Sequence, residues 1–137
     1  MKPIKLIAYI CFFALDTGLL SAQTLTVKVE NIEHIKSNLI VKLFNNAKDF
    51  PDVHFKSQDV KITDKTMTVT FPNLPKGMYA VTVYQDINEN KQLDNNFLGI
   101  PKEKYGLSNN IYKPSKPDFK TCSFLINSDI TINIKLK

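Results

Sequence analysis

The stretch DITINIKLK, residues 129–137, alternates polar and apolar side chains without a break. Successive side chains of an extended strand point to opposite faces, so its apolar members would share one face. Such a pattern is typical of an antiparallel strand with one face on a core and the other in solvent. The stretch therefore predicts a half-buried β-strand, whose apolar residues are Ile130, Ile132, Ile134 and Leu136.

The same period of two recurs in six further runs upstream. The breaks between them carry the Asn, Asp, Pro and Gly that chain reversals require, and no run after residue 23 has a helical period. Seven runs predict an all-β fold: a single antiparallel β-sandwich of about seven strands, prealbumin-like or immunoglobulin-like. The six runs are TLTVKVE (24–30), NLIVKLFN (38–45), VKITD (60–64), TMTVTF (66–71), MYAVTVYQ (78–85) and FKTCSFLI (119–126).

The N-terminus has a different composition. Two lysines precede an apolar run over residues 6–15, and small residues follow at Ser21 and Ala22. This is the order of a secretory signal peptide, and the apolar run is far shorter than the roughly 20 residues that span a membrane. We expect residues 1–22 to be a signal peptide and residues 23–137 to be one β-sandwich domain. The protein would be exported to the periplasm, the outer surface or the medium, with no transmembrane segment after cleavage.

Composition argues against several classes of function. Signal cleavage would leave Cys122 as the one cysteine, so no internal disulfide can form. The formal net charge of +5 comes from scattered lysines, and the chain has no arginine for bidentate contacts to phosphate or guanine, so nucleic acid is not an expected partner. His34 and His54 lie in no zinc or triad motif. We therefore expect no enzyme activity.

The segment from Asp86 to Asp118 breaks the rhythm of short strands and short loops. These 33 residues show no strand or helix pattern of their own. Loops of this length in compact domains are usually functional or disordered, and the apolar residues along this one can hold it against the sandwich. We expect a long ordered loop that carries the function.

Residues 74–110, LPKGMYAVTVYQDINENKQLDNNFLGIPKEKYGLSNN, resemble a family of small secreted bacterial proteins, the domain of unknown function number 2141. The matching motifs are Leu-Pro-x-Gly-x-Tyr-Ala, then Asp-x-Asn-x-Asn-x-x-x-Asp, then Gly-Ile-Pro-x-Glu-x-Tyr-Gly-x-Ser-Asn-Asn. Lys91 stands where that family usually has Gly, which matters if the turn there needs a positive φ. The resemblance implies an exported β-sandwich and brings no activity with it.

Within this segment, DINENKQLD (residues 86–94) places an oxygen at every second position, as calcium loops of the EF-hand type do. The twelfth position, normally a bidentate Glu, is Phe97, so Glu103, an Asn or water would complete the shell and binding would be weak, at about 0.1–1 mM. The alternative is a metal-free loop in which Asp and Asn accept their own backbone N–H groups. Both interpretations stay open; the calcium ligands would be Asp86, Asn88, Asn90, the Gln92 carbonyl and Asp94.

The end of the same segment, within residues 103–110, offers five polar or aromatic residues as a second set of candidates. These residues are candidates either for a recognition surface or for hydrogen bonds between loop and sheet. The sequence thus predicts an exported, non-catalytic binding or interaction module whose partner is a protein or glycan of the cell envelope. The alternatives are a structural envelope protein with a metal-free loop and, third, a hydrolase using Asp86 and Asp94. The ligand-binding candidates are Glu103, Tyr105, Ser108, Asn109 and Asn110.

Overall fold

The computed structural model describes residues 22–112 and 115–137. It contains eight strands in two sheets, which confirms the predicted all-β class. The predicted signal peptide lies outside the described residues except for its last position. The strands are β1 (Gln23–Glu30), β2 (Asn38–Phe44), β3 (Lys56–Lys61), β4 (Met67–Leu74), β5 (Gly77–Asp86), β6 (Tyr105–Leu107), β7 (Phe124–Ile126) and β8 (Ile130–Lys135).

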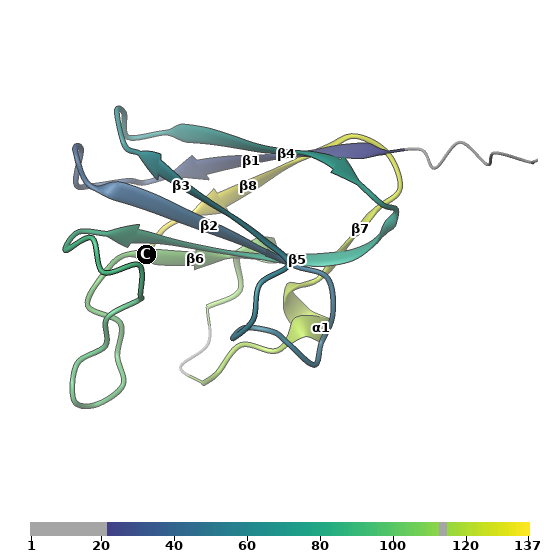
Figure 1. Ribbon diagram of the computed structural model, residues 1–137. Coiled ribbons are helices and arrows are strands. Elements are labelled where there is room, and N and C mark those ends of the chain that lie inside the picture. Colours follow the sequence, from purple (N-terminus) through teal and green to yellow (C-terminus); the bar gives the residue numbers. More distant parts are fainter. Residues whose placement is uncertain (1–21, 113–114) are drawn as a thin grey trace, which may run out of the picture.

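The two sheets lie as separate layers in Figure 1. One has the order β4-β1-β8, and the other has the order β3-β2-β5-β6 with β7 also paired to β5. Alternate residues of both sheets meet in one buried cluster, to which β1 contributes Leu25, Val27 and Val29 and β8 contributes Ile134. Burying an aliphatic side chain of this size contributes about 1.5–3 kcal/mol, so this shared core holds the layers together.

One strand pairing differs from the antiparallel prediction. β1 and β8 run parallel, in a register from Leu25 opposite Ile130 to Glu30 opposite Lys135. An alternating pattern tells which residues share a face but not the direction of the neighbouring strand. The first and last strands of the domain are therefore neighbours in the same sheet.

The run FKTCSFLI is not a continuous strand as predicted. Its first half forms a one-turn helix, α1 (Phe119–Cys122), and only Phe124–Ile126 is extended. Asp118 caps the helix, since its Oδ1 accepts the N–H of Thr121 at 3.0 Å and its Oδ2 accepts the Thr121 hydroxyl at 2.8 Å. No helix in the described part of the chain is long and apolar enough to cross a membrane.

The segment from Asp86 to Asp118 also contains regular structure, contrary to prediction. Strand β6 is followed by the 3-10 helix η1 (Ser108–Asn110). β6 pairs with β5, with Leu107 opposite Thr82. A Cβ at Gly106 would lie 2.5 Å from Cγ2 of Ile134, so a glycine lets β6 approach β8. The loop proper is therefore residues 87–104, here called the 87–104 loop.

Hydrogen bonds from side chains and chain ends join the two sheets at both edges. On one side, Nε2 of Gln58 in β3 donates to the carbonyl of Thr70 in β4 at 2.5 Å. On the other side, Lys137 and Tyr105 exchange backbone hydrogen bonds of 3.0 and 3.2 Å. Beside that pair, Oδ1 of Asn110 accepts the N–H of Lys135 at 2.9 Å, and its Nδ2 donates to the carbonyl of Asn133 at 3.1 Å.

Candidate functional site

Asp86, the last residue of β5, organises the start of the 87–104 loop. Its side chain is fully buried. Oδ1 accepts the N–H of Asn90 at 3.2 Å and Oδ2 accepts the N–H of Lys91 at 2.8 Å. The hydroxyl of Tyr84 donates to the carbonyl of Lys91 at 2.7 Å. The chain therefore turns back onto the end of β5 and is held there by both oxygens of one carboxylate.

Glu103 closes the same loop from its other end. It is buried, with 7% of its surface exposed. Oε1 accepts the N–H of Ile87 at 3.0 Å, and Oε2 accepts the N–H of Asp94 at 3.3 Å. Both carboxylate oxygens of this candidate ligand-binding residue thus bind the loop backbone. The two ends of residues 87–94 are held by one side chain.

Asp94 collects the exposed amides of the loop. Its Oδ2 accepts Nδ2 of Asn88 at 2.5 Å, and its Oδ1 accepts Nδ2 of Asn90 at 2.7 Å. The N–H of Gln92 donates to Oδ1 of Asn90 at 3.0 Å, as in an Asx turn. Of the five predicted calcium ligands, the structure brings three side chains into contact, whereas Asp86 faces the backbone. Among the described residues, no three His, Cys, Asp or Glu side chains gather as a metal-binding group.

Tyr84 is affected first by its own burial and then by the carboxylates near it. Burial raises the pKa of Tyr84 to about 12, with added repulsion from Asp86, Glu103, Asp59 and Asp94. The tyrosine is therefore a neutral hydrogen-bond donor to the Lys91 carbonyl across the physiological pH range.

Lys91 adopts the left-handed conformation that its sequence context left open. Its φ is 58°, and that of Glu89 is also 58°. A lysine therefore occupies a backbone conformation that glycine adopts without strain. The hydrogen bonds of its N–H to Asp86 and of its carbonyl to Tyr84 hold it there.

The tip of the 87–104 loop is a second turn that exposes apolar side chains. Oδ1 of Asn96 accepts the N–H groups of Leu98 at 2.9 Å and Ile100 at 3.0 Å. Phe97 is 95% exposed, Leu98 68% and Ile100 56%. Polar bonds in the turn thus fix a tip that presents three large apolar residues to solvent.

Three of the five ligand-binding candidates connect parts of the fold. Oγ of Ser108 accepts the N–H of Val81 at 3.0 Å and donates to the carbonyl of Cys122 at 2.5 Å. Nδ2 of Asn109 donates to the carbonyls of Thr121 and Ser123, at 3.0 and 2.9 Å. Asn110 binds the edge of β8 as described above. These polar groups hold η1 against β5, α1 and β8.

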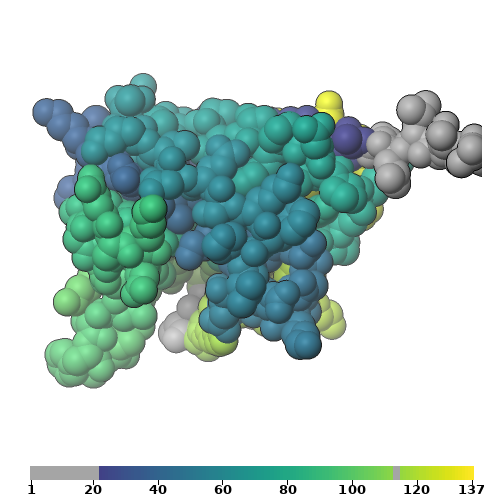
Figure 2. Space-filling model, viewed as in Figure 1, coloured from purple at the N-terminus to yellow at the C-terminus, as the bar shows by residue number. Residues whose placement is uncertain are grey.

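Tyr105 belongs to a groove that the sequence did not predict. The groove has a volume of about 700 Å³ and lies on the outer face of β2, β5 and β6. Figure 2 shows it as the hollow between the 87–104 loop and the loop after β2. Its floor includes Lys42, Thr82, Tyr84 and Tyr105, one wall is formed by Leu98, Gly99, Ile100 and Pro101, and the other by Pro51, Asp52, Ser115, Lys116 and Pro117.

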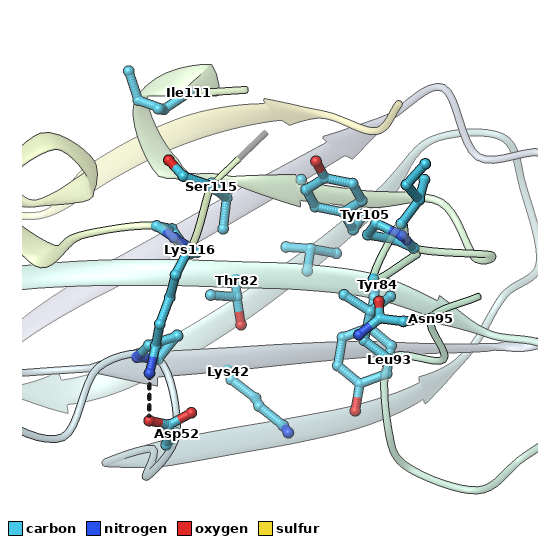
Figure 3. A pocket seen from close by; sticks show the side chains of 18 of the residues that line it. Lys42, Asp52, Thr82, Tyr84, Leu93, Asn95, Tyr105, Ile111, Ser115 and Lys116 are labelled. Atoms are coloured by element: carbon cyan, nitrogen blue, oxygen red, sulfur yellow. Dashed lines mark hydrogen bonds and ion pairs between the residues drawn. The ribbon is translucent and has the colours of Figure 1, made fainter. Parts of the chain in front are cut away.

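Of the two lysines that line the groove, one forms an ion pair within the described part of the chain and the other does not. Lys116 and Asp52 form an ion pair of 3.0 Å on one wall. Lys42 points into the space between that pair and Tyr84 in Figure 3, with its Nζ 5.4 Å from the centre of the Tyr84 ring. Within the described residues it has no carboxylate within 4.0 Å. In the sequence, the alternation of NLIVKLFN already places Lys42 on the face of the strand opposite to Val41 and Leu43, and this is the feature by which it could have been found.

A search against protein-family models finds one family. The model described as "Uncharacterized protein conserved in bacteria (DUF2141)" matches residues 27–133. No curated protein and no solved structure gives a significant match. The family match spans most of the chain, which therefore belongs to this family, as its motifs indicated.

Proposed function

We propose that this member of the bacterial DUF2141 family is a non-catalytic binding module whose ligand occupies the groove. The observation that carries the proposal is a concave surface of about 700 Å³, a size typical of ligand sites. Its two walls come from segments far apart in the sequence, and both are fixed by hydrogen bonds or ring contacts. A preformed hollow between two ordered walls supports binding more than a purely structural role.

A non-catalytic role agrees with the side chains in and around the groove. Neither His34 nor His54 lines it, and Cys122, the last residue of α1, is buried. Asp86 and Asp94, the carboxylates of the hydrolase alternative, accept loop N–H groups. A catalytic nucleophile is held by a base, and among the described lining residues no hydroxyl is hydrogen-bonded to a histidine side chain, a lysine side chain or a carboxylate.

We also propose that the protein is exported and that its fold is a β-sandwich. Residues 1–22 would be removed as a signal peptide, and the domain would work in the periplasm, on the outer surface or in the medium. The two layers with a shared core support classification as a β-sandwich, prealbumin-like or immunoglobulin-like.

A neutral solvatochromic dye tests the proposal. Nile red should bind the purified protein with a blue shift and increased emission, and filling the floor by Thr82→Phe should remove most of that signal. Thr68→Phe, which adds the same ring to the exposed outer face of β4, is the matched control and should leave it unchanged. Equal dye binding by both variants would contradict a ligand site in the groove, provided circular dichroism shows both are folded.

Calcium in the 87–104 loop is a second candidate. The contact of Asn88 and Asn90 with Asp94 favours it, because three predicted ligands already converge. The bonds from Asp86 and Glu103 to four backbone N–H groups favour the metal-free loop instead. We propose the metal-free form as the working state of the loop, and test it below.

A further inference from the structure

The walls of the groove are mainly apolar. Leu98, Ile100 and Pro101 form one side, and Pro51, Ile111 and Pro117 line the other. Leu98 and Ile100 are more than half exposed, so a ligand placed between the walls would remove them from water. Such burial is favourable in proportion to the apolar surface removed from water, which favours a ligand with an apolar body.

The floor of the groove carries one half-buried lysine, Lys42. Lys42 extends from the outer face of β2, where it lies opposite Thr82 of β5. Its Nζ makes a cation–π contact with the ring of Tyr84, 5.4 Å from the ring centre. An ammonium that loses water is stabilised best by an anion. A negatively charged group in the groove would give Lys42 the partner that the described chain does not.

The carboxylates around the groove either have other partners or lie outside its lining. Asp52 is paired with Lys116 at 3.0 Å. Asp86 and Glu103 each accept two backbone N–H groups of the 87–104 loop. Asp59 is exposed on the edge strand β3, opposite Ile40. The residues that line the groove thus carry one unpaired positive charge.

We propose that the ligand is a single-chain anionic amphiphile, with an apolar body between the walls and a carboxylate head at Lys42. This deepens the proposed function and rests on it. The groove volume of about 700 Å³ lies in the range of small-molecule sites and can hold both the apolar chain and the head group of such a ligand. The Thr82 hydroxyl, on the floor beside Lys42, adds a hydrogen-bond donor for the head.

Three probes with an alkyl chain of about ten carbons and an anionic, a neutral or a cationic head test this inference: decanoate, decanol and decyltrimethylammonium. Binding is measured below micelle-forming concentrations by displacement of Nile red, confirmed by calorimetry. Decanoate should bind at least about tenfold more tightly than the other two, which corresponds to about 1.4 kcal/mol. Lys42→Met keeps most of the aliphatic stem and should remove this preference by weakening decanoate binding at least about tenfold.

Lys76→Met is the matched control, since Lys76 is exposed in the turn between β4 and β5. It should bind all three probes as the wild type does. Equal binding of the three probes, or an unchanged preference for decanoate in Lys42→Met, would overturn the anionic head while leaving the groove as a binding site. Failure of every probe and of Nile red would overturn both the amphiphile and the proposed function.

Discussion

The two walls of the groove face each other across the same sheet but are stabilised by different forces. In the 87–104 loop, Asp86 and Glu103 accept four backbone N–H groups. In the opposite wall, the ring of Phe50 lies 5.0 Å from that of Phe44 and 5.9 Å from that of Phe119, both edge to face. The first wall depends on hydrogen-bond geometry and the second on the volume of buried rings.

This difference predicts how each wall fails. A wall held by directional bonds should open locally when one acceptor is lost, because few apolar contacts join it to the core. In a wall held by rings, the loss of one ring should also weaken the packing of the sheet below, because Phe44 belongs to β2 itself. The five predictions below test this contrast, from the largest expected change in the free energy of unfolding to the smallest.

Phe50→Ala should cost about 3–5 kcal/mol. The substitution removes a ring that is 7% exposed and leaves a cavity between Phe44 and Phe119. Chemical denaturation measures the loss. Phe97→Ala, at a ring that is 95% exposed, should stay within about 0.5 kcal/mol. Similar losses in both variants would show that the second wall is not held by its rings.

Asp86→Ala should cost about 2–3 kcal/mol, because it leaves the N–H groups of Asn90 and Lys91 without their charged acceptor. Hydrogen exchange should accelerate at these two amides and remain unchanged in the opposite wall. Glu89→Ala removes an exposed carboxylate of the same loop and is the control, with an expected effect within about 0.5 kcal/mol. Uniform acceleration over the whole domain would contradict local opening.

Tyr84→Phe should cost about 1 kcal/mol, the net value of its hydrogen bond to the Lys91 carbonyl. The pKa of Tyr84 is raised from 10.0 to about 12. Between these pH values the unfolded chain loses this proton while the folded chain keeps it, so wild-type stability should fall as pH rises. Tyrosinate absorbance should show a group titrating near pH 12 that is absent from the variant. Identical titration curves would refute this assignment.

Lys91→Gly should stabilise the protein by about 0.5 kcal/mol. Glycine relieves the strain of a φ of 58°, and part of that gain is lost to the greater entropy of the unfolded chain. Both loop bonds of residue 91 come from its backbone and should survive. Lys102→Gly, at an exposed position without positive φ, should destabilise slightly. A loss in Lys91→Gly would mean that the lysine side chain itself supports the turn.

Calcium should leave the melting temperature unchanged, because the loop carboxylates already have donors. Differential scanning calorimetry with millimolar calcium or a chelator measures this. If the native state binds calcium, mass action adds about 1.4 kcal/mol at ten times the dissociation constant. A gain of that kind, abolished by Asp94→Asn, would establish the calcium site in place of the metal-free loop.

The strands could be predicted where the polar alternation is long enough to detect. DITINIKLK contains β8, and the buried residues of this stretch, Ile134 in β8 and Leu136 just after it, lie on the predicted face. β6 escaped prediction because its three residues are fewer than two periods, and its pairing with β5 is a long-range contact. α1 was taken for a strand because Cys122 alternates with Phe124 and Ile126, whereas the cap at Asp118 decides the conformation.

The site was predictable in part. The spacing of Asp and Asn in DINENKQLD indicated local Asx turns as one of two interpretations, and the loop contains such bonds to Asp86 and Asn90. The two contacts of Glu103 across the loop depend on how the whole segment folds back. The groove itself arises from tertiary structure, because Lys42, Tyr105 and Lys116 come together only when three distant segments meet.

The amide of Asn110 has a further consequence for the behaviour of the protein in concentrated solution. It bonds Asn133 and Lys135 as a neighbouring peptide group would, and the hydroxyl of Tyr112 bonds the Lys135 carbonyl. Unpaired groups along a strand edge are a template onto which another chain can add, and such additions lead to aggregates. By occupying these groups with its own side chains, the molecule protects its last strand from intermolecular β-sheet growth.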